Sequence, residues 1–189
     1  MTHTPRPRAH WPRRQVLLGG AALALGLTPA APAIARTGRT GARRLAFYNL
    51  HTSESVDVEY YAEGRYLREG LASLDRFMRD VRDGTRVRMN PRLYDLLFDL
   101  HARMDSIQPF HLISGYRSPG TNAFLRRRGG GVAKHSLHMR GLAADVRLPG
   151  RGLPQLWEAA RGLRRGGVGL YTRSDFIHVD TGRVRAWGR

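Results

Sequence analysis

The stretch SLHMRGLAAD, residues 136–145, carries the most specific information in the sequence about how the chain folds. In this stretch, His138 stands three residues before Gly141 and seven residues before Asp145. Glycine favours a turn at such a point, and the apolar residues after it predict a short strand over 142–148 that includes Asp145. A chain that turns at Gly141 can bring the side chains of His138 and Asp145 together.

A second stretch, SDFIHVD over residues 174–180, predicts another strand, which carries His178. If this strand pairs beside the first, His178 joins His138 and Asp145. Two histidines and an aspartate are ligands that zinc accepts, and a catalytic zinc keeps three protein ligands and an open position for water. The same residues also fit a hydrogen-bonded polar cluster without a metal, so this pattern leaves both interpretations open.

Two further residues complete a pattern that is typical of metal-assisted hydrolysis. Asp175 lies three residues before His178, where a carboxylate can accept a proton from a water on the metal. Arg117 stands in a turn bounded by glycine and proline, after a predicted apolar strand over 110–114. Its guanidinium can stabilise an oxyanion as a scissile carbonyl becomes tetrahedral.

Three polar neighbours of these residues have more than one interpretation. His135 can line the site, bind a substrate carboxylate or contact a metal ligand, and it fits an exposed loop equally well. Asp180 faces the same side of its strand as His178, so it can orient a histidine ligand or pair with an arginine. Ser136 can hold the turn, and no histidine–carboxylate relay is spaced around it to make it a nucleophile.

The remaining periodicities predict an α+β fold, with a small antiparallel β-sheet and flanking helices in one domain over 44–189. Further strands are expected over 45–50, 56–61 and 168–171, and the last of these is expected to pair with the strand over 176–180 that carries His178. Helices are expected over 70–82, 91–104, 122–128 and 153–163.

Residues 1–35 have the order of an export signal: a basic start, a short apolar run and a stretch of small residues. The pair Arg13-Arg14, followed by Gln15-Val16-Leu17-Leu18, resembles a twin-arginine signal. Ala33-Ile34-Ala35 is a suitable cleavage site, and residues 36–43 are expected to be a flexible lead-in. An uncleaved membrane anchor is the alternative interpretation of this leader.

Composition excludes several classes of protein. The 189 residues contain no cysteine, which rules out disulfide scaffolds, thiol nucleophiles and cysteine-ligated zinc fingers. The net charge is +17, and removal of the leader, which has four arginines and no acid, leaves +13. Aromatic residues do not alternate with these arginines and no recognised module is present, so a nucleic-acid partner is not expected. Outside the cytoplasm such a charge meets anionic cell-wall polymers first.

Together, these motifs resemble the LAS-type zinc peptidases, which include VanX-like dipeptidases and D-Ala-D-Ala carboxypeptidases, with hedgehog signalling domains as distant relatives. The finer resemblance is to the exported YcbK-like branch, the murein endopeptidase K type. It spans residues 44–189 and rests on the segments SGYRS (114–118), HSLH (135–138) and FIHVDTG (176–182), with Trp187 near the end.

The resemblance implies one Zn²⁺ ion held by His138, Asp145 and His178. It also implies that Asp175, where VanX-like members place a glutamate, is the catalytic base and that Arg117 polarises the substrate carbonyl. The implied substrates are peptidoglycan stem peptides, cut at D-Ala-containing or meso-diaminopimelate cross-links. We therefore expect a monomeric zinc-dependent murein endopeptidase with a hedgehog/D-Ala-D-Ala peptidase-like fold. It would act in the periplasm or cell envelope, without stable membrane insertion once the signal is cleaved. A D-Ala-D-Ala carboxypeptidase and a catalytically weak peptidoglycan-binding module remain the alternatives.

Overall fold

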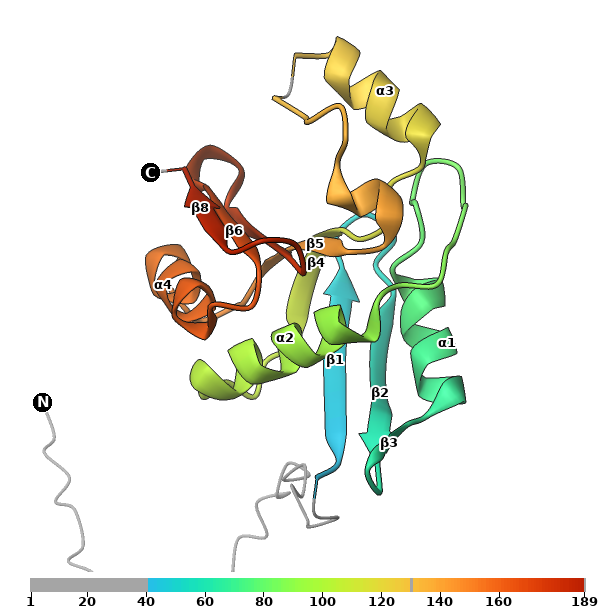
Figure 1. The fold of residues 1–189 in the computed structure, drawn as a ribbon, viewed down its shortest axis with the longest axis vertical. Helices are drawn as coiled ribbons and strands as arrows, with labels where there is room; N and C mark the ends of the chain where they lie inside the picture. The colour runs from blue at the N-terminus through green and yellow to red at the C-terminus, as the bar shows by residue number, and fades with distance from the viewer. Residues whose placement is uncertain (1–40, 130, 189) are drawn as a thin grey trace, which may run out of the picture. The chain divides into compact units, whose positions relative to one another are not determined.

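One mixed sheet of eight strands organises the described part of the chain, which in this computed structural model comprises residues 41–129 and 131–188 (Figure 1). The predicted leader, and all but the last three residues of the predicted lead-in, lie outside these residues. The strand order is β3-β2-β1-β4-β5-β7-β6-β8. The strands are β1 (Arg43–Asn49), β2 (Ser55–Ala62), β3 (Arg65–Tyr66), β4 (Phe110–Ser114), β5 (Ala143–Arg147), β6 (Gly167–Tyr171), β7 (Phe176–Asp180) and β8 (Arg185–Trp187).

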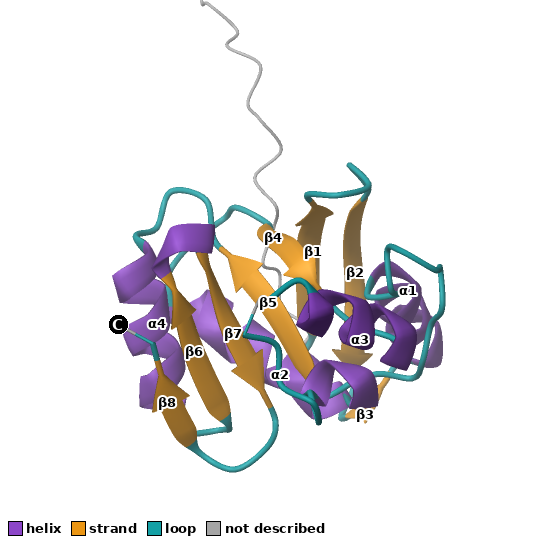
Figure 2. Cartoon of the chain, turned by 90° about the horizontal axis from the view of Figure 1, so that it is seen from above, coloured by secondary structure: helices purple, strands orange, loops and turns teal. Residues whose placement is uncertain are grey.

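Four helices accompany the sheet, so the predicted α+β class is confirmed. They are α1 (Arg68–Phe77), α2 (Pro91–Arg103), α3 (Pro119–Arg127) and α4 (Leu153–Leu163). Helix α2 contacts β1, and α4 contacts α2, β6 and β7. In Figure 2, α2 and α4 lie behind the sheet and α3 lies in front of it. Among the described residues, no helix is both long enough and apolar enough to cross a bilayer.

The sheet is larger than the small antiparallel sheet that the sequence predicts, and it is mixed: five of its strand pairs are antiparallel and two are parallel. Strands β1 and β4 pair in parallel, as do β6 and β8. The first parallel pair arises because α1 and α2 lie between its strands in the sequence and return the chain in the same direction. Strands β3 and β8 have two and three residues, which is too short to show the alternation of apolar and polar residues that identifies a strand.

Two helix boundaries lie three or more residues from the predicted ones. Helix α3 begins at Pro119 rather than at 122, because the Ser118 side chain caps it by accepting a hydrogen bond from the backbone N–H of Thr121. Helix α1 ends at Phe77 instead of 82, and the residues that follow form a turn. Arg43 belongs to β1 rather than to a flexible lead-in.

The core lies between the sheet and helices α1, α2 and α4. Alternate residues of β1 face it, including Leu45 and Phe47, while Leu93, Leu97 and Leu100 supply one side of α2. All five side chains are at most 2% exposed. This packing holds β4, β5 and β7 next to one another at the centre of the sheet, where the candidate site residues lie.

Candidate metal centre

The fold brings His138, Asp145 and His178 together from three segments. Asp145 on β5 and His178 on β7 are direct partners in the antiparallel register. His138 comes from the 3₁₀ turn Leu137–Arg140 (η1), and Ser136 caps this turn by accepting a hydrogen bond from the His138 N–H at 3.3 Å. Gly141 ends the turn at φ 65°, where a Cβ would also lie only 3.1 Å from the carbonyl oxygen of Arg88. Glycine is therefore needed to aim His138 at the strand pair.

The three side chains offer one ligand atom each at spacings that suit a metal ion. His138 Nε2 lies 3.1 Å from both Asp145 Oδ1 and His178 Nδ1, and the last two atoms are 2.9 Å apart. Tetrahedral ligands placed about 2.0–2.1 Å from a zinc ion lie about 3.3 Å from one another. All three residues are buried.

The hydrogen bonds on the far sides of the imidazoles indicate which ring nitrogens carry protons. His138 Nδ1 lies 2.7 Å from the carbonyl oxygen of Gly115, so this nitrogen carries the hydrogen and donates it. His178 Nε2 lies 3.0 Å from Asp180 Oδ2 and donates to that carboxylate. We therefore assign free lone pairs to His138 Nε2 and His178 Nδ1. These two lone pairs and the Asp145 carboxylate point toward one another, so their negative charge is mutually repulsive. A cation placed between them removes this repulsion. The donor set thus fits a divalent metal.

Asp180 is fully buried and holds the second histidine in place. Besides the bond from His178, it accepts backbone N–H groups from Gly167 and Gly182, at 3.1 and 2.8 Å, and two hydrogen bonds from Arg185. Burial raises the pKa of Asp180, but these hydrogen bonds outweigh burial and hold it well below its ordinary value. Of the alternatives that the sequence left open, the structure shows contacts of Asp180 with both His178 and an arginine.

The environment of the triad also changes the pKa values of two of its members. Burial raises the pKa of Asp145, but the neighbouring His138 and His178 outweigh it and lower that pKa. Burial lowers the pKa of His178, but hydrogen bonds to Asp145 and Asp180 outweigh it, and the net shift is upward. A proton on His178 can therefore partly replace the cation that the lone pairs require.

We predict that acid weakens metal binding because the proton and the metal compete for His178. A raised pKa means that the imidazolium persists to a higher pH than in an ordinary histidine, so affinity should rise with pH through that raised value. The free energy of unfolding of the metal-free protein should instead fall as the pH rises. The stabilising charge of His178 is complete below the unfolded pKa of about 6.5 and is lost above its folded pKa. Competition with a chromophoric chelator between about pH 5 and 8 measures the affinity, and a flat profile would contradict the prediction.

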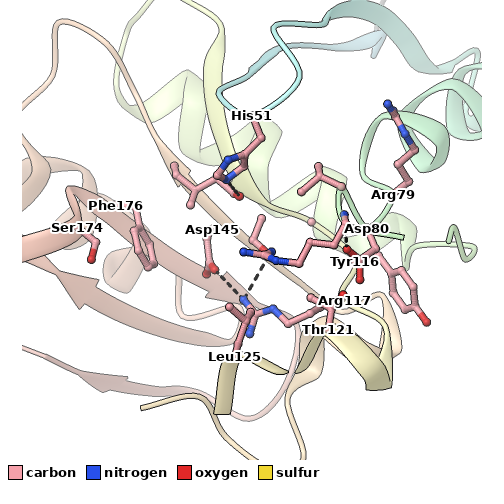
Figure 3. Close-up of a pocket in the computed structure, with 15 residues that line it drawn as sticks. His51, Arg79, Asp80, Tyr116, Arg117, Thr121, Leu125, Asp145, Ser174 and Phe176 are labelled. Carbon is pink, nitrogen blue, oxygen red and sulfur yellow. Dashed lines mark hydrogen bonds and ion pairs between the residues drawn. The ribbon is translucent and has the colours of Figure 1, made fainter. Parts of the chain in front are cut away.

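Arg117 and one member of the triad, Asp145, lie at the wall of a cavity of about 310 Å³ (Figure 3). Its guanidinium Nη2 lies 3.3 Å from Asp145 Oδ2 and 3.3 Å from Ser114 Oγ, and the residue is only 8% exposed. Burial lowers the Arg117 pKa. Tyr116 and Phe176 also line the cavity, which is large enough to admit part of a peptide beside the triad.

Asp175, the predicted catalytic base, does not line this cavity. It stands at φ 53° between a short 3₁₀ turn, Thr172–Ser174 (η2), and β7, and its carboxylate pairs with Arg147 at 2.8 Å. It lines a neighbouring cavity of about 280 Å³ with Arg147, whereas Ser174 and Phe176 on either side of it line the first cavity. His135 is exposed and lines neither cavity, and Ser136 caps η1.

Several residues that line the first cavity have no role in the sequence reasoning. His51 follows β1, and the segment Arg79–Arg82 follows α1. Both segments lie more than 30 positions before Arg117, outside the motifs that identify the site. His51 belongs to the segment 51–54, which fits the start of the family pattern but suggests no role for the histidine. The only signal for the second segment is a run of alternating charges over 79–83, which is equally typical of an exposed helix end.

Comparison with known proteins gives a consistent result. The family model described as "Peptidoglycan L,D-endopeptidase MepK" matches residues 37–187. The chain is 42% identical over 175 residues to the Escherichia coli K12 protein of that name, covering 93% of this chain and 96% of the relative. It is 38% identical over 176 residues to a probable MepK of Haemophilus influenzae, covering 93% and 94%.

A solved structure, the Serratia marcescens L-Ala D-Glu endopeptidase ChiX, aligns with a TM-score of 0.34 at 25% identity. That alignment spans 41% of this chain and 62% of ChiX. The family model and the two relatives confirm the sequence-based prediction of a murein endopeptidase K type peptidase. The chain belongs to the peptidoglycan L,D-endopeptidase MepK family.

Proposed function

We propose that this protein is an exported zinc-dependent endopeptidase that hydrolyses amide bonds in peptidoglycan stem peptides or their cross-links. The observation that carries the proposal is the convergence of lone pairs from His138, Asp145 and His178 beside a cavity that Asp145 and Arg117 line. The names of the relatives, which describe peptidoglycan L,D-endopeptidases, support the substrate class.

One zinc ion, held by the two histidines and the aspartate, would supply an acidic water and polarise the scissile carbonyl. Magnesium and calcium prefer sites made of oxygen ligands, so two imidazoles among three donors favour zinc. Asp180 and the Gly115 carbonyl keep both imidazoles in the tautomer that a metal requires.

Arg117 is proposed to receive the negative charge that develops on the carbonyl oxygen. Its ion pair with Asp145 and its bond to Ser114 fix the guanidinium at the cavity wall before substrate arrives. A donor that is already oriented costs no reorganisation during the reaction, and removal of such a donor typically lowers kcat by about 100- to 1,000-fold.

Asp175 is proposed as the general base, and this role requires a change of partner. Its carboxylate is paired with Arg147, and the two side chains are 62% and 36% exposed. Exposed ion pairs contribute only about 0–1 kcal/mol, so exchanging Arg147 for a water at the site costs little. The proposed sequence of events is that substrate binding precedes this exchange and that Asp175 then transfers the proton to the leaving amine.

The cellular location is proposed from the leader. Residues 1–35 have the twin-arginine pattern, so the protein is expected to be exported folded and to act in the periplasm or cell envelope. Peptidoglycan-directed relatives support the same compartment.

The proposal predicts chelator-sensitive loss of cross-linked muropeptide dimers, with monomers appearing in their place. Purified dimers are incubated with the protein, with and without a chelator, and the products are weighed by mass spectrometry. The product masses identify the bond that is cut. Release of a terminal D-Ala alone would instead indicate a carboxypeptidase, and unchanged dimers with zinc bound would refute the proposed hydrolysis.

A further inference from the structure

The turn that follows α1 is fixed to the wall of the first cavity by one buried carboxylate. Asp80 is 2% exposed, and it accepts hydrogen bonds from the backbone N–H groups of Arg82, at 2.9 Å, and Ser118, at 2.8 Å. The Asp80 backbone closes the turn by bonding with Gly84 and Thr85. Arg82 therefore starts from a backbone position that is tied directly to the segment that carries Arg117.

The arginines that line this cavity differ in whether a carboxylate of the protein forms an ion pair with them. Arg79 donates to both carboxylate oxygens of Glu54, at 3.0 and 2.8 Å, and Arg117 is paired with Asp145. Figure 3 shows Arg79, Asp80 and Arg117 around the same opening. Arg82 lines the cavity too, but no carboxylate in the described parts of the chain forms an ion pair with it.

Two observations place the free guanidinium of Arg82. Its Cζ lies 5.9 Å from the ring centroid of Phe124, close to the outer limit of a cation–π contact, whereas Arg128 lies closer to that ring at 4.8 Å. Arg82 also lies at the wall of the cavity that Arg117 lines. Two cations that face one cavity form a favourable position for an anion.

We propose that Arg82 is a specificity-determining residue that binds a carboxylate of the stem peptide beside the bond that is cut. The identity of the peptide rests on the proposed function. Stem peptides offer such a group on D-glutamate and on diaminopimelate, and a guanidinium can bind a carboxylate through two parallel hydrogen bonds. The carboxylate binds to Arg82 at the cavity wall and leaves Arg117 free for the carbonyl oxygen.

The test compares three cross-linked dimers: the unmodified dimer, a dimer amidated on diaminopimelate and a dimer amidated on the D-glutamate α-carboxyl. The wild type should lose about 10- to 100-fold in kcat/KM on the dimer whose amidation removes the bound carboxylate, mainly through KM. Arg82→Gln should show the same loss on the unmodified dimer and no discrimination between the dimers. Which amidation has the effect identifies the carboxylate.

Arg86→Gln is the matched control, because Arg86 lies in the same exposed segment, carries the same charge and does not line the cavity. It should behave as the wild type. Binding of the uncross-linked tripeptide and its amidated forms, measured by calorimetry, gives an answer that is independent of cleavage. If no dimer is cut but tripeptide binding still depends on Arg82, the proposed function fails and the subsite stands. Equal affinity for all three tripeptides, or full discrimination by Arg82→Gln, overturns the subsite.

Discussion

Replacement of His138 by alanine is expected to remove the metal and to lower hydrolysis by more than about 100-fold. Residues that only orient a metal ligand already cost about 10- to 100-fold when they are lost, and His138 supplies a ligand atom itself. The substitution leaves Asp145 and His178 with only two donors at 2.9 Å from each other. Metal content after dialysis and the rate of dimer cleavage are the two measurements.

His135→Ala provides the control for this variant. It removes a histidine three residues away that is exposed and lines neither cavity, so metal content and rate should stay at the wild-type level. Full metal occupancy in His138→Ala would eliminate His138 as a ligand.

Substitution of Asp175 by alanine is expected to leave the metal in place and to lower kcat by about 100- to 10,000-fold, the range for loss of a general base. The metal remains because Asp175 belongs to neither the triad nor its hydrogen-bonded supports. Steady-state kinetics on cross-linked dimers, together with metal analysis of the same sample, measure both effects.

Arg147→Gln separates a catalytic role of Asp175 from a structural one. Both variants break the same exposed ion pair, so a purely structural Asp175 would make them equally mild. If Asp175 is the general base, the two variants should differ. Arg147→Gln frees the Asp175 carboxylate and keeps or raises kcat, whereas Asp175→Ala removes the carboxylate and lowers kcat. Equal rates in the two variants would discard Asp175 as the base.

The sequence predicts the central part of the fold well because local signals agree there. Gly141 marks the turn, and strands β5 and β7 have enough residues to show their pattern. That these strands pair, with Asp145 opposite His178, is shown by the structure. The parallel pairing of β1 with β4 depends on how α1 and α2 return the chain, which no local pattern specifies.

The site shows the same division. His138, Asp145 and His178 lie in compact motifs whose spacing carries information, and the structure brings them together. The direction of the Asp175 carboxylate depends instead on the left-handed backbone conformation of Asp175 itself and on its ion pair with Arg147 on the neighbouring strand β5. Arg82 reaches the cavity only because Asp80 connects two distant turns, a contact that becomes visible only in three dimensions.

Strand β8 has a consequence for the order in which the protein is assembled. Arg185 donates to Asp180, which in turn accepts from His178, and the Trp187 ring centroid lies 5.2 Å from that of His178. Trp187 also covers Gly169, where any Cβ would lie within 2.5 Å of its ring. The support of the metal centre is therefore completed by residues that are synthesised after all three ligands. A nascent chain that stops before Arg185 already contains every ligand and still has a weakened metal site.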